Sequence, residues 1–171
     1  YFVTMCTQNR ECLFGEIVNG EMILNEYGKI VEQCWNDLPN HYDNIELDAY
    51  VIMPDHFHGI IFIVSVGAIH ELPRQRQHEL PRQRQHELPR QRQHELPRQR
   101  QQQRRKMLLP KIVGRFKMNS AKQINQMRNT PGISVWQRNY YERIIRDEKS
   151  LQNIRNYIIN NPLKWYYDNN A

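Results

Sequence analysis

The first third of the chain alternates apolar and polar residues in the way that β-strands do. Within residues 45–53, Ile, Leu, Ala and Val alternate with Glu, Asp and Tyr, which predicts a strand with one buried face. The apolar run His58–Val64 predicts a second strand, separated from the first by Pro54-Asp55. Residues 1–7 predict a further strand at the start of the chain.

Turn and capping residues divide the segment between these strands. Asn19-Gly20 lies between two apolar stretches and predicts a tight hairpin over Glu16–Leu24. Asn25 has the chemistry of a helix N-cap, and we expect a helix from about Glu26 to Trp35, with Pro39 just beyond it.

The last third of the chain has the spacing of two amphipathic helices. In the first, apolar residues recur at helical intervals, at Ile112, Val113, Phe116, Ile124 and Met127. In the second, Asp147 is an N-cap candidate ahead of a stripe formed by Leu151, Ile154 and Ile158, and Pro162 is expected to end the helix. The resulting order, β-β-β-α-β-β-α-α, predicts an α+β fold with helices packed against an antiparallel sheet.

A perfect repeat interrupts this pattern. The octapeptide His-Glu-Leu-Pro-Arg-Gln-Arg-Gln occurs four times between His70 and Gln101, and a basic run follows it. Each unit carries too little apolar surface to offset the entropy of ordering, so we expect 67–106 to be a disordered, basic insert loop within one domain that spans 1–171. Histidines eight residues apart on such a tether give only a weak indication of metal binding.

Charge is distributed unevenly along the chain. Residues 1–69 have a net charge of −8, whereas 70–106 and 107–171 each have +7. This asymmetry favours a polyanionic partner such as nucleic acid, although a solvated basic surface has the same composition. In the C-terminal part, Lys111, Arg115 and Lys122 share a helix face and are candidate phosphate contacts.

Composition excludes several other classes of protein. No signal peptide or membrane-length apolar run is present, and three cysteines without metal-ligand spacing fit reduced thiols in a cytoplasmic protein. The chain begins at Tyr1 within a predicted strand, so we expect that a natural N-terminal segment is missing.

Two motifs carry candidate chemistry. In an extended backbone, His56 and His58 point to the same side of the strand and could form half of a divalent metal site. The alternative is a histidine pair that is only hydrogen-bonded at a sheet edge. On the last helix, Tyr157 and Asn161 are one turn apart and could project from one face. Such a tyrosine is otherwise an ordinary core residue with a hydrogen-bonded hydroxyl.

Taken together, these segments resemble the single-tyrosine transposases of insertion sequences, the HUH class, and within them the REP-associated tyrosine transposases. The likeness lies in Val51–Ile61 around His-Phe-His, in Val113–Lys117, in Val135–Glu142 and in Arg155–Trp165. It covers nearly the whole chain except the repeat, in the same order. It departs from the family where the insert interrupts the chain and where an N-terminal DNA-recognition segment is missing.

The resemblance implies a ferredoxin-like (RRM-like) fold and a homodimer that cleaves and rejoins single-stranded DNA near hairpins. It implies that His56 and His58 bind Mg²⁺ or Mn²⁺, with Asn161 completing the metal site. Tyr157 would attack the phosphate and form a 5′-phosphotyrosine. A phenol is a weak nucleophile at neutral pH, so a Lewis acid at the phosphate suits this chemistry.

Other assignments stay open at this stage. Arg138, in Trp136-Gln137-Arg138, faces substrate or is structural, and Tyr140 and Tyr141 compete with Tyr157 for the role of nucleophile. The second functional hypothesis is a non-catalytic nucleic-acid-binding protein derived from a transposase, and a third is a structural zinc protein, which lacks thiolates at suitable spacing. The expected location of the transposase is the cytoplasm of a bacterium, at the nucleoid.

Overall fold

The computed structural model describes residues 1–64 and 107–170. The predicted insert, 67–106, lies outside the described residues and stays a prediction. The described chain is an α+β domain, as the sequence predicts. In this part of the chain, no helix is long and apolar enough to cross a membrane.

A four-stranded antiparallel sheet forms the centre of the molecule. Its strands lie in the order β4-β5-β1-β6. Their bounds are β1 (Phe2–Cys6), β4 (Ile45–Met53), β5 (His56–Ile63) and β6 (Tyr141–Arg143). With helix α1 (Glu26–Asn36) after β1 and helix α3 (Leu108–Met127) after β5, the sheet has the β-α-β-β-α-β topology of ferredoxin-like folds, to which a hairpin and a last helix are added.

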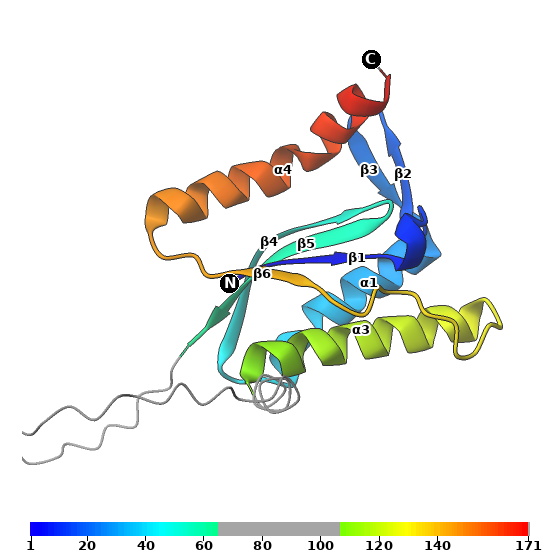
Figure 1. Ribbon diagram of the computed structural model, residues 1–171, viewed down its shortest axis with the longest axis horizontal. Coiled ribbons are helices and arrows are strands. Elements are labelled where there is room, and N and C mark those ends of the chain that lie inside the picture. The colour runs from blue at the N-terminus through cyan, green and yellow to red at the C-terminus, as the bar shows by residue number, and fades with distance from the viewer. Residues whose placement is uncertain (65–106, 171) are drawn as a thin grey trace, which may run out of the picture.

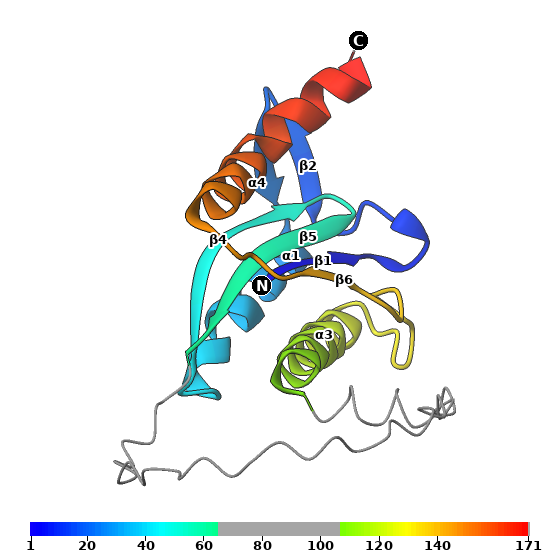
Figure 2. The ribbon, with the colours of Figure 1, turned by 60° about the vertical axis from the view of Figure 1, so that its left-hand side comes forward.

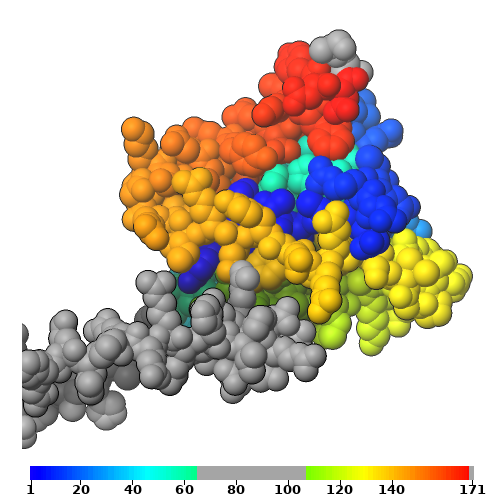
Figure 3. Space-filling model, in the orientation of Figure 1, coloured from blue at the N-terminus to red at the C-terminus, as the bar shows by residue number. Residues whose placement is uncertain are grey.

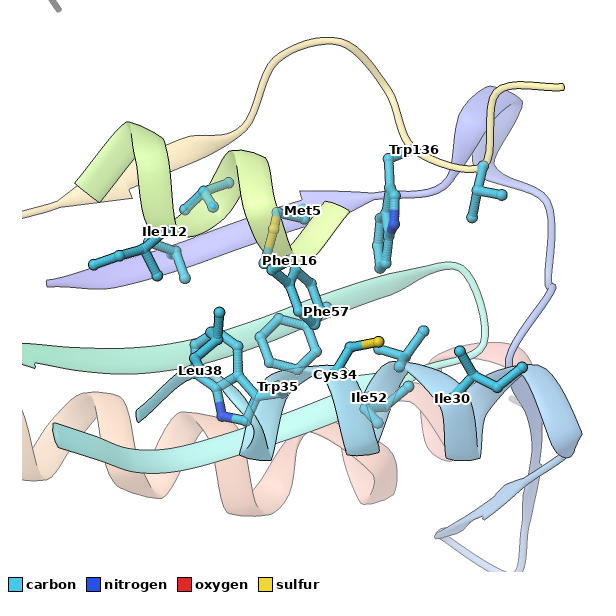
Figure 4. Close-up of a cluster of buried hydrophobic side chains, with 14 of the residues drawn as sticks. Met5, Ile30, Cys34, Trp35, Leu38, Ile52, Phe57, Ile112, Phe116 and Trp136 are labelled. Atoms are coloured by element: carbon cyan, nitrogen blue, oxygen red, sulfur yellow. The ribbon is translucent and has the colours of Figure 1, made fainter. Parts of the chain in front are cut away.

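The helices lie on both faces of this sheet. α1 and α3 lie side by side on one face, and the last helix, α4 (Glu148–Asn170), crosses the other (Figures 1 and 2). Since side chains alternate along a strand, β1, β4 and β5 each contribute to two cores. Met5 and Phe57 pack with Trp35 of α1 and Phe116 of α3 on one side (Figure 4), whereas Ile60 packs beneath α4 on the other.

Local signals in the sequence are realised in the N-terminal half. Asn19 and Gly20 have positive φ angles of 52° and 83°, as a tight turn between β2 (Gly15–Val18) and β3 (Glu21–Leu24) requires. Asn25 caps α1, because its side chain accepts hydrogen bonds from the backbone N–H groups of Tyr27 and Gly28. The predicted hairpin and helix start are therefore confirmed. Two short 3₁₀ turns, η1 (Gln8–Arg10) and η2 (Leu38–Asn40), connect the elements.

Because Gly59 has no side chain, Trp35 of α1 can pack directly against the strand that carries the two histidines. A Cβ atom at this position would lie 2.6 Å from Cζ2 of Trp35, which is closer than real Cβ contacts. Because Trp35 is fully buried, it cannot move aside without cost. The glycine between His58 and Ile60 thus allows Trp35 to pack against the middle of β5.

The structure corrects several expectations. β6 is an additional short strand between the last two helices, β5 begins at His56, and Met127 is half exposed and not part of the buried stripe of α3. The largest difference concerns Pro162, which does not end the last helix: α4 continues through it to Asn170.

The packing of α4 explains why the proline is tolerated. A proline removes one backbone hydrogen bond and is therefore unfavourable inside an isolated helix. The turns after Pro162 contact the β2–β3 hairpin, where Leu163 lies against Gly20, and Trp165 lies against His56. These tertiary contacts offset the lost hydrogen bond.

Candidate active site

The two histidines of β5 project together toward α4. Because side chains alternate along the strand, Phe57 points into the core beneath the sheet, while His56 and His58 point to the opposite face. Both imidazoles are buried, and their ring centroids are 4.7 Å apart. The predicted orientation of the pair is therefore confirmed, and the pair lies within the sheet, since β5 is flanked by β4 and β1.

A buried carboxylate orients His56. Oδ1 of Asp55 lies 2.5 Å from His56 Nδ1, and Oδ2 of the same carboxylate lies 2.8 Å from the Nε of Arg10. Asp55 is only 4% exposed, and its backbone oxygen accepts two hydrogen bonds from Thr7. A carboxylate on Nδ1 favours the tautomer whose Nε2 carries a free lone pair, which is the arrangement typical of metal-binding histidines.

His58 is held from both sides. Its Nδ1 lies 2.7 Å from the hydroxyl of Thr4 on β1, and its Nε2 lies 3.2 Å from the hydroxyl of Tyr157 on α4. Phe2 stacks on the imidazole with a centroid distance of 5.4 Å and contacts the Tyr157 ring edge-on. The imidazole is thus fixed between the neighbouring strand and the candidate nucleophile.

Burial keeps both histidines neutral. It is the largest cause that lowers the pKa of His56, and the Asp55 carboxylate opposes it in part. For His58, burial together with the nearby His56 and Arg10 lowers the pKa to about 3. Neutral imidazoles at physiological pH are the form that binds metal ions.

Helix α4 brings Tyr157 to this pair. Leu151, Ile154 and Ile158 are buried against the sheet, and the Nε of Arg155 lies 2.8 Å from Oδ2 of Asp48 on β4. The β4–β5 register shifts between Leu47 and Tyr50, so Asp48 lies in an irregularity of the strand. With these anchors on the same helix, Tyr157 is 43% exposed while its hydroxyl reaches His58.

Asn161 completes the group that the sequence predicts. It is 7% exposed and lies one helical turn after Tyr157. It lines the same pocket, of about 280 Å³, as the histidines and Tyr157. The other lining residues are Thr4, Arg10, Lys164, Trp165 and Asp168. In the space-filling view, α4 (orange to red) and the N-terminal residues (blue) lie on either side of a narrow strip in the colour of β5, the strand that carries the histidines (Figure 3).

The donor set fits a divalent cation with open coordination positions. In the described part of the chain, no group of three or more His, Cys, Asp or Glu side chains is placed to hold a metal ion, so a site closed by such side chains is absent there. Two neutral imidazoles and the Asn161 amide oxygen would leave positions for water and phosphate oxygens. Imidazole nitrogens are typical ligands of transition-metal ions, whereas Mg²⁺ prefers oxygen ligands, so the set favours a transition-metal ion over Mg²⁺.

The candidate DNA contacts lie away from this pocket. Lys111, Arg115 and Lys122 are on α3, on the opposite face of the sheet from α4. Arg138 is exposed in the segment that leads to β6. The structure does not bring these four residues together with the histidines, and their role in DNA binding stays a prediction.

The competing tyrosines are elsewhere. Tyr141 begins β6 and is 58% exposed. Tyr140 packs against the core beneath the sheet, and its hydroxyl donates a hydrogen bond to Glu142 over 2.7 Å. Neither residue lines the histidine pocket, whereas Tyr157 does.

Sequence reasoning missed several pocket residues. Asp55 directly precedes His56, so a carboxylate next to a metal-ligand candidate was a usable signal. Lys164 and Trp165 were hidden because the helix was expected to end at Pro162. Arg10 had no local signal, since it reaches the site through the fold of η1.

Comparison with known proteins places the chain. It matches no protein-family model. A protein of Haemophilus influenzae named "Uncharacterized protein" is 41% identical over 169 residues, which cover 98% of this chain and 82% of that protein. This chain belongs to the family of that Haemophilus protein.

Solved structures add information on the fold. The structure of a REP-associated tyrosine transposase bound to a REP hairpin superposes on this chain with a TM-score of 0.50. The two sequences are 15% identical, and the match covers 95% of this chain. The match spans 66% of that transposase chain, and the likeness shows that the fold is of this transposase kind. A provisionally named transposase of Deinococcus radiodurans R1 has a TM-score of 0.46 and 15% identity, over 93% of this chain and 87% of its own. At that score, the second likeness supports no statement about the chain.

Proposed function

We propose that this protein is a tyrosine-nucleophile, metal-dependent endonuclease that cleaves and rejoins single-stranded DNA, as a transposase does. The observation that carries the proposal is the contact between Tyr157 and the histidine pair: the Tyr157 hydroxyl lies 3.2 Å from His58 Nε2. Two neutral imidazoles, a buried Asn161 and a half-exposed tyrosine in one pocket supply a nucleophile and a set of metal ligands.

The residues of the chain would share the work as follows. Tyr157 Oη attacks the phosphorus, and the bond from phosphorus to the 3′ oxygen breaks. The hydroxyl proton is lost to solvent and the departing 3′ oxygen takes a proton from solvent, which leaves a 5′-phosphotyrosine and a 3′-hydroxyl. His56, His58 and Asn161 would hold Mn²⁺ or Mg²⁺. When bound, the cation supplies Lewis-acid stabilisation of the phosphate charge.

The covalent step also explains how strands could be rejoined. In the phosphotyrosine, the phosphate is still a diester, linked to the DNA and to the tyrosine. Attack by a 3′-hydroxyl can therefore restore the DNA and free Tyr157. A nuclease that uses water would leave a phosphate monoester at the strand end, which a 3′-hydroxyl could not rejoin by simple exchange of one ester for another.

The substrate class follows from chemistry and from the structural neighbour. That transposase is bound to a REP hairpin, and we propose single-stranded DNA with a hairpin as the substrate here. The homodimer implied by the resemblance stays a prediction. The described chain brings its own His58 and Tyr157 together.

The test is a covalent adduct on hairpin-bearing single-stranded DNA in Mn²⁺, resolved on a denaturing gel and mapped by peptide mass spectrometry. Tyr157→Phe removes one oxygen and keeps the ring, so DNA affinity is expected to stay the same and the adduct to disappear. Tyr141→Phe, also at an exposed tyrosine, is the control and should form the adduct at the wild-type rate.

The outcome separates two functions. An adduct on Tyr157 supports the transposase reaction. DNA binding without any adduct in Mn²⁺ or Mg²⁺ supports the non-catalytic binding protein instead, and an adduct that maps to Tyr140 or Tyr141 contradicts the assignment of α4 as the catalytic helix.

A further inference from the structure

Arg10 is the one pocket cation contributed by the acidic part of the chain. Residues 1–69 have a net charge of −8 and only two basic residues, Arg10 and Lys29. Lys29 pairs with Glu26 on the surface of α1. Arg10 lines the pocket that contains His56, and its side chain is 50% exposed.

The backbone at Arg10 adopts an unfavourable conformation. Asn9 and Arg10 have consecutive φ angles of 56° and 59°, in the left-handed region that non-glycine residues rarely occupy. The hydroxyl of Thr7 stabilises this turn, because its Oγ1 lies 2.8 and 2.9 Å from the backbone oxygens of Glu11 and Asp55 and shares its one hydrogen between them. Such strain is found where surrounding contacts impose it, often at functional sites.

Two further contacts fix the guanidinium group itself. Its Nε lies 2.8 Å from Oδ2 of Asp55, and its Nη1 donates to Sγ of Cys6 over 2.9 Å. Among the described residues, its Nη2 makes no hydrogen bond. A planar group held at two corners, with N–H donors left over at the edge of a pocket, is suited to bind an anion.

We propose that Arg10 binds a phosphate of the substrate strand at the active site and that Asp55 holds its guanidinium in position for this contact. The inference rests on the proposed function, since it names a residue that positions the substrate of the same reaction. The arginine and lysine side chains that line the pocket are those of Arg10 and Lys164. Arg10 is the one whose geometry the structure fixes.

The alternative is that Arg10 only neutralises the buried Asp55. The two roles differ in salt dependence, because a phosphate contact releases counterions whereas an internal ion pair does not. The experiment measures the binding of a short single-stranded DNA to the Tyr157→Phe variant, which cannot form the adduct, at several salt concentrations. Arg10→Gln, Arg10→Lys and Lys29→Gln are each added to that background.

Arg10→Gln is expected to weaken binding about ten-fold and to reduce the slope of log affinity against log salt by about 0.7. Arg10→Lys keeps the charge but loses the planar fork, so it should keep the slope and recover only part of the affinity. Lys29→Gln, on α1 and therefore on the sheet face opposite to the one that α4 covers, should change neither quantity.

An unchanged slope in Arg10→Gln, in a protein with native circular dichroism, overturns the inference and leaves the structural role. If Arg10→Gln does not fold, Arg10→Lys decides: wild-type affinity in that variant overturns the inference. Absence of DNA binding by the Tyr157→Phe parent overturns both proposals. DNA binding that depends on Arg10, without an adduct in the wild type, contradicts only the cleavage reaction.

Discussion

Replacing Asp55 by Asn tests whether the second layer of the site controls metal binding. The carboxylate contacts His56 Nδ1 through one oxygen and Arg10 Nε through the other. An amide of the same shape offers one oxygen and one NH₂ group. The N–H groups of His56 and Arg10 that face Asp55 then have a single oxygen between them, and one of them must face the new NH₂ group. Either His56 loses the partner that fixes its tautomer, or Arg10 loses its ion pair.

The expected magnitude follows from these contacts. Hydrogen bonds to charged groups contribute about 1.5–3 kcal/mol each. Arg10 is half exposed, so solvent screening reduces its share, and most of the loss comes from His56, whose side chain is 8% exposed. We expect a loss of about 2 kcal/mol in unfolding free energy. The Kd for Mn²⁺ should rise about 10- to 100-fold, as for other partners of metal-bound histidines.

The measurement is a Mn²⁺ titration by electron paramagnetic resonance, without DNA, together with a thermal melt. Asp37→Asn is the matched control, because the Asp37 carboxylate also contacts a histidine, with 2.8 Å between its Oδ2 and His41 Nε2, but on the surface away from the pocket. It should leave the Mn²⁺ affinity unchanged. A Kd for Mn²⁺ within two-fold of wild type in the folded Asp55→Asn protein would refute the positioning role.

Two further outcomes are expected. The double variant His56→Ala/His58→Ala, like wild type in EDTA, should lose the adduct while single-stranded DNA binding stays within a few-fold, and adduct formation at the wild-type rate would contradict the metal assignment. Mixing His58→Ala with Tyr157→Phe protein should give no adduct on the denaturing gel, because the tyrosine hydroxyl meets the histidine of its own chain. Recovery of the adduct on mixing would show that partner chains exchange the helix.

Local patterns in the sequence were sufficient for much of the fold. The turn at Asn19-Gly20 depends on neighbouring residues alone and is seen in the structure. The alternation along residues 45–53 predicted the strand correctly but its single buried face wrongly. Ile45 and Leu47 pack in the core with α1 and α3, whereas Ala49 packs beneath α4, because the register shifts between Leu47 and Tyr50. The orientation of His56 and His58 follows from the same rule of alternation. For the turn and the histidine pair, the cause acts within a few residues, so the sequence carries it directly.

Features fixed by distant contacts could not be predicted in this way. β6 has only three residues, and it is a strand because it pairs with β1, which lies about 140 positions earlier in the chain. The approach of Arg10 to Asp55 spans 45 positions and needs the left-handed turn at Asn9. Neither has a periodic pattern that a local rule detects.

The error at Pro162 shows how a local rule can hide part of a site. The rule considers one lost hydrogen bond, whereas the structure adds the contacts of Leu163 with the hairpin and of Trp165 with His56, at a centroid distance of 5.8 Å. A helix that ended at the proline would have left the pocket without Lys164 and Trp165. Since α4 is anchored on the sheet before Tyr157 and on the hairpin after it, the tyrosine stands between two fixed turns. The proline is thus accommodated in the helix that holds the proposed nucleophile against His58.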